Sequence, residues 1–286
     1  MTKFVGILNI TPDSFSDGGK FVDEEKILQH LQKMLEEGAD VIDVGAESTR
    51  PQAVSLTPEE EWLRLANILI KIVASCKYFS EKHNKKILTS IDSYHFETIK
   101  KSYELNVDIV NDVKGLQDER IVEFIAKNNI TTILMHNEKL STNPQIIIND
   151  AINVVDEIIE WARRKIKVLQ ENGVKKSQLI FDPGIGFNKN AQQSIRILRN
   201  VERFKELDLP IYIGHSKKSF MKEIFKDSSF WHDLQVSGSL SEIDLRENDT
   251  KNLLEIRAQK TVMISRFLMQ KGVDYIRVHD VAMNRF

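Results

Sequence analysis

The sequence predicts an α/β protein with the (β/α)8 architecture of a TIM barrel, in a single domain that covers residues 1–286. Three observations support this prediction. Short apolar segments alternate with helical patterns along the chain, most of these segments end in polar residues, and the length suits one barrel. Because the active site of such barrels is built at the carboxyl ends of the strands, the polar strand ends predict an enzyme.

Eight segments are predicted to be strands, because each is short and rich in Val, Ile, Leu or Phe and is bounded by polar or turn residues. In chain order they are residues 4–9, 41–44, 87–91, 107–110, 130–135, 179–181, 211–213 and 275–280. Strands at this spacing, with a helix between each pair, are expected to pair in parallel through βαβ units.

The first helix is predicted over residues 23–37, where Ile27, Leu31 and Met34 recur at helical spacing before Gly38. The second begins at Pro58, which three glutamates follow, and extends to about residue 80. Helical patterns also cover residues 95–104, 119–128, 150–172, 192–206 and 251–271.

The end of the chain departs from a regular barrel. Residues 227–248 have the weakest pattern and are interpreted as a long surface excursion. Only residues 282–286 follow the last strand, so the eighth helix is predicted to be truncated. The outer apolar face of the first and last strands would then be exposed, which predicts a homodimer or a longer native chain that covers it.

Composition is that of a soluble cytoplasmic enzyme. The chain is 41% hydrophobic and 29% charged, and its net charge of −2 creates no long-range field for nucleic acid. Cys76 is the only cysteine, which suits a reducing compartment. No apolar run reaches the roughly 20 residues that span a bilayer, and the immediate entry into a strand leaves no room for a signal peptide. We therefore expect no nucleic-acid partner and no membrane association.

Two strand ends carry arginine. Arg277 and His279 alternate along the last strand, so both face the same way and offer a guanidinium and an imidazole to a phosphate-like group. The alternative for Arg277 is a rim salt bridge to Asp280 or a neighbour. Thr49 and Arg50 follow the second strand, where the alternative is a solvated loop charge. Two arginines at two strand ends favour a dianionic ligand such as pyrophosphate.

Side chains that could recognise a heterocyclic ring follow four other strands: Asp92, Asn111, Asp182 and Lys218. A carboxylate accepts two adjacent N–H donors of an amino-pyrimidinone, Asn donates and accepts, and Lys donates. The alternative for each is a helix N-cap, which stays open for Asn111 and Asp112 because only one of them can face inward. Asn9, at the end of the first strand, is an oxygen ligand suited to Mg²⁺. His136 and His215 are interpreted as packed or solvated histidines.

At these residues the chain resembles the dihydropteroate synthases of folate biosynthesis, a pterin-binding barrel family. The matching blocks are GILNITPDSFSDGG at residues 6–19, ESTRP at 47–51, DPGIGF at 182–187, SKKS at 216–219 and RVHD at 277–280. The resemblance covers essentially the whole chain. It implies the condensation of 6-hydroxymethyl-7,8-dihydropterin pyrophosphate with para-aminobenzoate, which yields 7,8-dihydropteroate and pyrophosphate.

The resemblance also implies a role for each candidate residue. The pterin is assigned to Asp92, Asn111, Asp182 and Lys218. The pyrophosphate and its Mg²⁺ are assigned to Asn9, Thr49, Arg50, Arg277 and His279, with Asn9 as the metal ligand. The para-aminobenzoate pocket, where sulfonamides compete in this family, is assigned to Phe15, Thr49, Pro51, Phe187, Lys218 and Ser219. The residues expected to act in catalysis are Asp92, Lys218, Arg277 and His279.

The implied chemistry needs no general base. Mg²⁺ and two arginines would stabilise charge on departing pyrophosphate, and the dihydropterin can delocalise the positive charge left on its exocyclic methylene. An SN1-like path is therefore expected, with Asp92 as the carboxylate that stabilises the cationic ring.

Five positions depart from the pattern usual in the family. Ala46 and Asn188 replace glycine, Ser93 replaces Thr, Lys217 replaces Arg, and Asn137 replaces an apolar residue. Lys217 lacks a stacking guanidinium, which is expected to loosen pterin stacking without abolishing it.

Two other functions are considered. A pterin-binding barrel of the methyltransferase type would share the inward Asp and Asn but has no use for the Arg277/His279 pair or for Lys217-Lys218. A non-catalytic homologue would fit the missing helix, but not the intact anion site. A pyrophosphate-release assay separates them.

Overall fold

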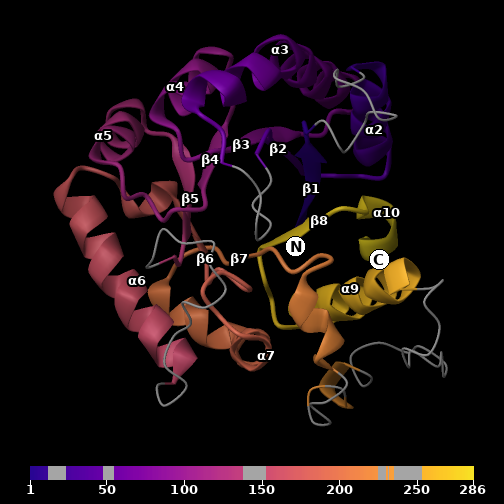
Figure 1. Cartoon of the computed structure of the whole chain (residues 1–286), viewed down its shortest axis with the longest axis vertical. Helices are drawn as coiled ribbons and strands as arrows, with labels where there is room; N and C mark the ends of the chain where they lie inside the picture. Colours follow the sequence, from indigo (N-terminus) through magenta and orange to yellow (C-terminus); the bar gives the residue numbers. More distant parts are fainter. Residues whose placement is uncertain (12–23, 48–54, 138–152, 225–229, 231, 235–252) are drawn as a thin grey trace.

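Eight parallel strands form a ring at the centre of the molecule, and the helices surround it (Figure 1). The computed structural model describes residues 1–11, 24–47, 55–137, 153–224, 230, 232–234 and 253–286. The strands are β1 (Lys3–Asn9), β2 (Val41–Gly45), β3 (Leu88–Asp92), β4 (Ile109–Asp112), β5 (Thr131–Met135), β6 (Leu179–Asp182), β7 (Tyr212–Ile213) and β8 (Tyr275–Val278).

Pairing along the ring follows the order β6-β5-β4-β3-β2-β1-β8-β7. β1 therefore lies between β2 and β8, with Val5 opposite both Val41 and Arg277. Between β6 and β7 the ring is closed by an isolated parallel bridge from Phe181 to Ile211, and the N–H of Phe181 donates to the carbonyl of Pro210 over 2.8 Å. The predicted (β/α)8 barrel is confirmed.

The helices alternate with the strands along the chain. They are α2 (Glu24–Glu36), α3 (Pro58–His83), α4 (Phe96–Glu104), α5 (Glu119–Asn128), α6 (Val154–Glu171), α7 (Ala191–Arg199), α9 (Leu253–Gln270) and α10 (Val281–Asn284). Short 3-10 turns cover η1 (Lys176–Gln178), η2 (Val201–Leu207) and η3 (Ser219–Lys222). No helix in these described parts of the chain is long and apolar enough to cross a membrane.

Local signals in the sequence set the helix ends. Thr57 accepts the N–H of Glu60 over 3.2 Å, and the Glu60 carboxylate accepts the N–H of Thr57 over 2.8 Å, which completes a capping box before Pro58. The predicted helix over residues 192–206 is instead split. Asn200 ends α7 by donating from its side-chain amide to the carbonyl of Arg196 over 2.8 Å, and η2 follows.

Side-chain alternation separates two layers inside the ring. The lower layer is apolar and consists of Val5, Val41, Ile109, Ile133, Ile180 and Tyr212. Two residues further along their strands, on the same inner face, Val41 is followed by Asp43, Ile109 by Asn111 and Ile180 by Asp182. The apolar layer thus supports a polar layer at the carboxyl ends of the strands.

The prediction that the outer face of β1 and β8 is exposed is wrong. Ile276 and Val278 are fully buried, and Phe4 and Leu8 are at most 3% exposed. The single turn of α10 supplies Val281, which packs with α2 against Gly6 of β1: a Cβ atom built on Gly6 would lie 2.8 Å from Met34 Sδ and 3.5 Å from Val281 Cγ2. The homodimer remains a prediction, without support from an open face.

Candidate active site

Arg277 joins two carboxylates inside the mouth of the barrel. Its Nε donates to Oδ2 of Asp43 and its Nη2 to Oδ2 of Asp92, each over 2.7 Å. Asp43 is fully buried, and the Arg277 side chain is 18% exposed. The alternative of a rim salt bridge to Asp280 is therefore not what forms: Arg277 pairs inward, across β8, β2 and β3.

Asn111, rather than Asp112, faces the barrel interior. The side-chain amide of Asn111 donates to the same Asp43 oxygen over 3.1 Å. The Asp112 carboxylate instead accepts the N–H groups of Lys114 and Leu116 in the loop after β4. The alternative of a helix-cap role fails for Asn111, and a backbone-binding role holds for Asp112.

Asp182, Lys218 and Phe187 meet on the opposite side of the mouth. Asp182 accepts the N–H of Gly184 over 2.7 Å, which fixes the start of the loop after β6. Lys218 Nζ donates to the carbonyl of Ile185 and lies 4.7 Å from the centroid of the Phe187 ring. The loop after β6 and the turn after β7 thus bring a cation and an aromatic face together, as the predicted para-aminobenzoate pocket requires. Ser219 is exposed beside Lys218 at the start of η3.

His279 and Asn9 occupy the strand ends nearest to Arg277. His279 Nδ1 lies 2.9 Å from the hydroxyl of Ser216, which also accepts the N–H of His279 over 3.3 Å. Asn9 ends β1 with the same alternation as Val5 and is partly exposed at the mouth.

Burial shifts the ionisation of this cluster. Burial raises the pKa of Asp92 to about 7, Arg277 opposes that shift, and Asp43 reinforces it. Burial also raises the pKa of Asp182, although Lys218 opposes the rise. The pKa of Lys218 is lowered by burial to about 8, against the attraction of Asp182. For Arg277, burial opposes ionisation, but Asp43 and Asp92 raise its pKa above the ordinary value. Shifted pKa values of this kind cluster at functional sites, and here they coincide with the inward side chains at the barrel mouth.

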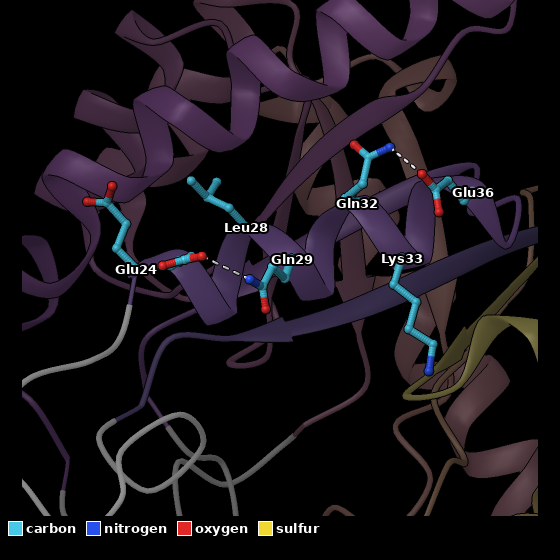
Figure 2. Close-up of a pocket in the computed structure, with 7 residues that line it drawn as sticks. Glu24, Leu28, Gln29, Gln32, Lys33 and Glu36 are labelled. Atoms are coloured by element: carbon cyan, nitrogen blue, oxygen red, sulfur yellow. Dashed lines mark hydrogen bonds between the residues drawn. The ribbon is translucent and has the colours of Figure 1, made fainter.

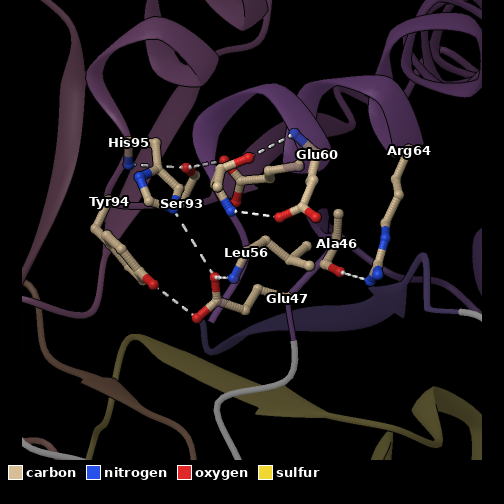
Figure 3. A network of polar contacts seen from close by, with 10 residues as sticks. Ala46, Glu47, Leu56, Glu60, Arg64, Ser93, Tyr94 and His95 are labelled. Atoms are coloured by element: carbon tan, nitrogen blue, oxygen red, sulfur yellow. Dashed lines mark hydrogen bonds and ion pairs between the residues drawn. The ribbon is translucent and has the colours of Figure 1, made fainter. Parts of the chain in front are cut away.

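Four predicted site residues, Phe15, Thr49, Arg50 and Pro51, lie outside the described residues. The residues that flank the last three are held by a polar network (Figure 3). Glu47 accepts the N–H of Leu56 over 3.0 Å and the hydroxyl of Tyr94 over 2.7 Å. Ser93 donates to buried Glu61 over 2.8 Å, so the serine keeps the hydroxyl that the usual threonine would supply.

Ala46, another departure from the family pattern, is fully buried at the base of the same loop. Its carbonyl accepts a bond from Nη1 of Arg64 on α3 over 3.0 Å (Figure 3). The side chain of Ala46 belongs to the main apolar core.

Asp43 is the site residue that the sequence prediction missed. A single acid inside an otherwise apolar strand, at the same alternation as Val41, was the available signal. Lys189 was also missed: it is 7% exposed, and Nζ lies 2.9 Å from His136 Nδ1. His136 and His215 are 1% and 0% exposed, which agrees with their interpretation as packed residues.

A hollow of about 610 Å³ lies elsewhere, on the outer side of α2 (Figure 2). Its lining residues all belong to that helix, and its polar groups bond along the helix: Gln29 to Glu25 over 3.1 Å and Gln32 to Glu36 over 2.6 Å. No residue of a second element lines it, and it contributes nothing to the barrel mouth.

Comparison with known proteins shows the family of this chain. Residues 5–279 match the model of the family described as pterin binding enzyme. A dihydropteroate synthase of Clostridium beijerinckii is 34% identical over 99% of this chain and 90% of its own length. The chain therefore belongs to the pterin-binding enzymes. Within them it belongs to the dihydropteroate synthases, which are transferases of folate biosynthesis.

Solved structures show the same fold with ligands. The dihydropteroate synthase of Xanthomonas albilineans with 4-aminobenzoic acid superimposes with a TM-score of 0.79 at 28% identity, over 99% of this chain and 89% of that one. The enzyme of Anaplasma phagocytophilum with bound 6-hydroxymethylpterin-monophosphate gives a TM-score of 0.77 at 33% identity, over 99% and 95%.

Proposed function

We propose that this chain condenses 6-hydroxymethyl-7,8-dihydropterin pyrophosphate with para-aminobenzoate and releases pyrophosphate. The observation that carries the proposal is the convergence of Asp92, Asn111 and Asp182 with Lys218 and Arg277 at one end of the barrel. This set combines acceptors for the N–H groups of an amino-pyrimidinone with a cation for its ring oxygen or nitrogen. The similar structures with a pterin monophosphate and with 4-aminobenzoic acid support both substrates.

The pterin would lie on the polar layer, above the apolar side chains. Asp182 and Asn111 offer acceptors and a donor from two sides of the ring, and Lys218 approaches from a third. Asp92, whose pKa burial raises to about 7, would face the ring and could ionise fully as positive charge develops. Binding and charge stabilisation therefore use the same carboxylate.

The pyrophosphate would bind beyond the pterin, at Arg277 and His279. Arg277 uses Nε and Nη2 for Asp43 and Asp92, and Nη1 takes no part in these two bonds. A guanidinium held in this way is already oriented when the anion arrives, which lowers the entropy cost of binding. His279 is oriented by the Ser216 hydroxyl in the same manner.

The reaction is proposed to follow an SN1-like path. The bond from the exocyclic carbon to the pyrophosphate oxygen breaks, the electron pair leaves with pyrophosphate, and the ring delocalises the positive charge. The amine nitrogen of para-aminobenzoate then forms the new C–N bond and loses a proton to solvent or to pyrophosphate. Lys218 and Phe187 would hold the aromatic acid in line for this attack, since a cation and a ring face lie together there.

Mg²⁺ is proposed as the cofactor. Among the residues whose positions the structure describes, no cluster of three or more His, Cys, Asp or Glu could hold a metal. Asn9 fits the alternative in which one neutral protein oxygen, water and substrate phosphate share the ion. When bound, Mg²⁺ would neutralise charge on the departing pyrophosphate.

A pyrophosphate-release assay tests the function. The purified chain should release pyrophosphate and form 7,8-dihydropteroate in equal amounts when the pterin pyrophosphate, para-aminobenzoate and Mg²⁺ are all present. Sulfonamides, which resemble para-aminobenzoate in shape and charge, should raise the KM for that substrate without changing kcat. Failure to form 7,8-dihydropteroate from the two substrates with Mg²⁺ would contradict the proposed reaction. Light scattering would show whether the enzyme is the predicted homodimer.

A further inference from the structure

The loop after β6 is bonded to the end of β5 by two adjacent pairs of residues. We call the four residues the loop bridge: His136, Asn137, Asn188 and Lys189. In one pair, the side-chain amide of Asn188 donates to Oδ1 of Asn137 over 2.6 Å. In the other, Nζ of Lys189 lies 2.9 Å from Nδ1 of His136.

Lys189 is a buried cation that binds the loop to itself. Its Nζ donates to the carbonyls of Gly184 and Phe187, each over 2.9 Å, in addition to the His136 contact. A longer contact of 3.4 Å reaches the backbone carbonyl of His136, so the ammonium group lies among acceptors from both loops. Because Nδ1 of His136 accepts from Lys189, the imidazole is neutral, and burial together with Lys189 lowers the pKa of His136.

The Asn137–Asn188 pair ties a third loop into the arrangement. The side-chain amide of Asn137 donates to the backbone carbonyl of Val113 over 2.9 Å. The backbone carbonyl of Asn137 accepts from the side-chain amide of Gln117 over 3.2 Å. Asn188 has a φ of +51°, a left-handed conformation that Gly and Asn adopt more readily than other residues. The loops after β4, β5 and β6 are thus joined side by side.

The bridged loop carries groups of both substrate subsites. Asp182, which ends β6 just before the loop, accepts the N–H of Gly184, and the carbonyl of Gly184 binds Lys189. Phe187, whose carbonyl also binds Lys189, presents its ring to Lys218. The space around Gly184 is closed, since a Cβ atom there would lie 2.3 Å from the carbonyl oxygen of His136.

We propose that the loop bridge is a set of positioning residues, which fixes Asp182 and Phe187 before either substrate binds. None of the four touches the reacting atoms. Their effect on catalysis passes through the backbone of Gly184 and Phe187, and it falls more heavily on the aromatic acid, because Phe187 lies further from the β6 strand than Asp182. This inference rests on the proposed function for its kinetic part alone.

The first test is Lys189→Met, which keeps a long apolar stem and removes the donors. Loss of a buried charged donor should raise the KM for para-aminobenzoate by about tenfold, with a smaller effect on the KM for the pterin. Hydrogen exchange of the amides in residues 184–187 should accelerate. Lys167→Met is the matched control, because that side chain on α6 is 79% exposed, and it should change none of these values.

The second test is Asn188→Gly. It removes the hydrogen bond from the Asn188 side chain to Asn137, and glycine adopts the left-handed backbone without strain. The KM for para-aminobenzoate should rise by about threefold, the change expected for one neutral hydrogen bond. In a cycle with Asn137→Ala, Asn188→Gly should have no effect on this KM once Asn137→Ala is present. Asn137→Ala keeps an effect of its own in the Asn188→Gly background, because it also removes the bond to the carbonyl of Val113.

These outcomes distinguish a positioning role of the loop bridge from simple packing. They also distinguish failure of that role from failure of the proposed reaction. If both variants fold and neither KM nor the exchange of residues 184–187 changes, the loop bridge has no positioning role. If Lys189→Met does not fold, Asn188→Gly and its cycle decide alone. If the unsubstituted protein releases no pyrophosphate, the proposed function fails. The exchange rates of the variants then still confirm or overturn the bridge.

Discussion

Nη2 of Arg277 donates to Oδ2 of Asp92 over 2.7 Å, so the residue expected to bind pyrophosphate is bonded to the residue expected to bind the pterin. The two proposed subsites therefore share one ion pair rather than lying side by side as separate units. Asp43 completes the arrangement from below, on Nε of the same guanidinium. A substitution in one subsite should consequently change binding in the other.

Arg277→Ala should weaken binding of the pterin pyrophosphate by roughly 2 kcal/mol or more, through loss of a charge-assisted contact. Binding of a pterin without phosphates should also weaken, because Asp92 loses its partner, but by less. Calorimetry with both ligands measures the difference. Arg120→Ala is the matched control, since Arg120 pairs with Asp118 over 2.6 Å at an exposed position on α5. Equal losses for the two ligands would remove Arg277 from the anion site.

Asp43→Asn should reduce pterin affinity by about 1.5–3 kcal/mol, the range for hydrogen bonds to a charged group. The reason is indirect: Asp43 accepts from both Arg277 and Asn111, and an amide in its place turns one acceptor into a donor. Asp40→Asn is the control, because Asp40 pairs with Lys85 over 2.9 Å before β2, at the opposite end of that strand. It should lower the melting temperature and leave the pterin dissociation constant unchanged.

Asp92→Asn should make the protein more stable at pH 8 than the unsubstituted enzyme, while abolishing most activity. The folded-state pKa of about 7 lies above the ordinary 3.8, so the folded protein keeps a proton that the unfolded chain loses between these values. Stability is therefore lost as the pH rises from about 4 to about 7, and the asparagine avoids this loss. Thermal melting at pH 5 and pH 8 measures it, with the larger gain expected at pH 8.

Asp118→Asn should change the stability at pH 8 in the opposite direction, that is, lower it. A hydrogen bond from Arg120 lowers the pKa of Asp118, so its contribution to stability is present above the ordinary value and is lost as the pH falls below it. The variant should melt slightly lower than the unsubstituted protein at pH 8. If Asp92→Asn also lowered the melting temperature at pH 8, the ion pair of Asp92 with Arg277 would outweigh the cost of burying the charged carboxylate.

Gly186→Ala should lose activity by displacing Lys218. Gly186 has a φ of +77°, and a Cβ atom there would lie 3.3 Å from Lys218 Cδ. Gly173→Ala is the matched control. Gly173 has a φ of +87°, and a Cβ atom there would lie 3.6 Å from Cβ of Ala126, in ordinary van der Waals contact. Both variants should lose about 1 kcal/mol of stability from the left-handed backbone. Only Gly186→Ala should raise the KM for para-aminobenzoate.

The barrel and most of its described site residues could be predicted from the sequence, because strand period, helix caps and polar strand ends are local signals. Asn111 and Asp182 follow apolar inward residues by two positions, so alternation alone orients them. Asp43 could not be assigned in this way, since its role depends on Arg277 reaching across the ring from a strand 234 residues away in sequence.

Contacts between loops that are distant in the sequence could not be predicted from it either. Asn137 and Asn188 were each recognised as a departure from the family pattern, and only the fold shows that the two bond to each other. The prediction of an exposed outer face on β1 was wrong for a related reason. One turn of helix at α10 covers this face, because Val281 and Met34 both pack against Gly6. A side chain at residue 6 would have required a different arrangement.

The closure of the ring has a consequence for the lifetime of the protein. β1 and β2 are matched over five residue pairs, whereas β6 and β7 meet at a single bridge. Asp182 ends β6 and Lys218 follows β7, so a bound pterin that contacts both would span this seam. Occupancy of the site and integrity of the fold then belong to one equilibrium, in which ligand stabilises the closed ring by mass action. If pterin binds across this seam, its removal should make the ring open more readily to proteolysis.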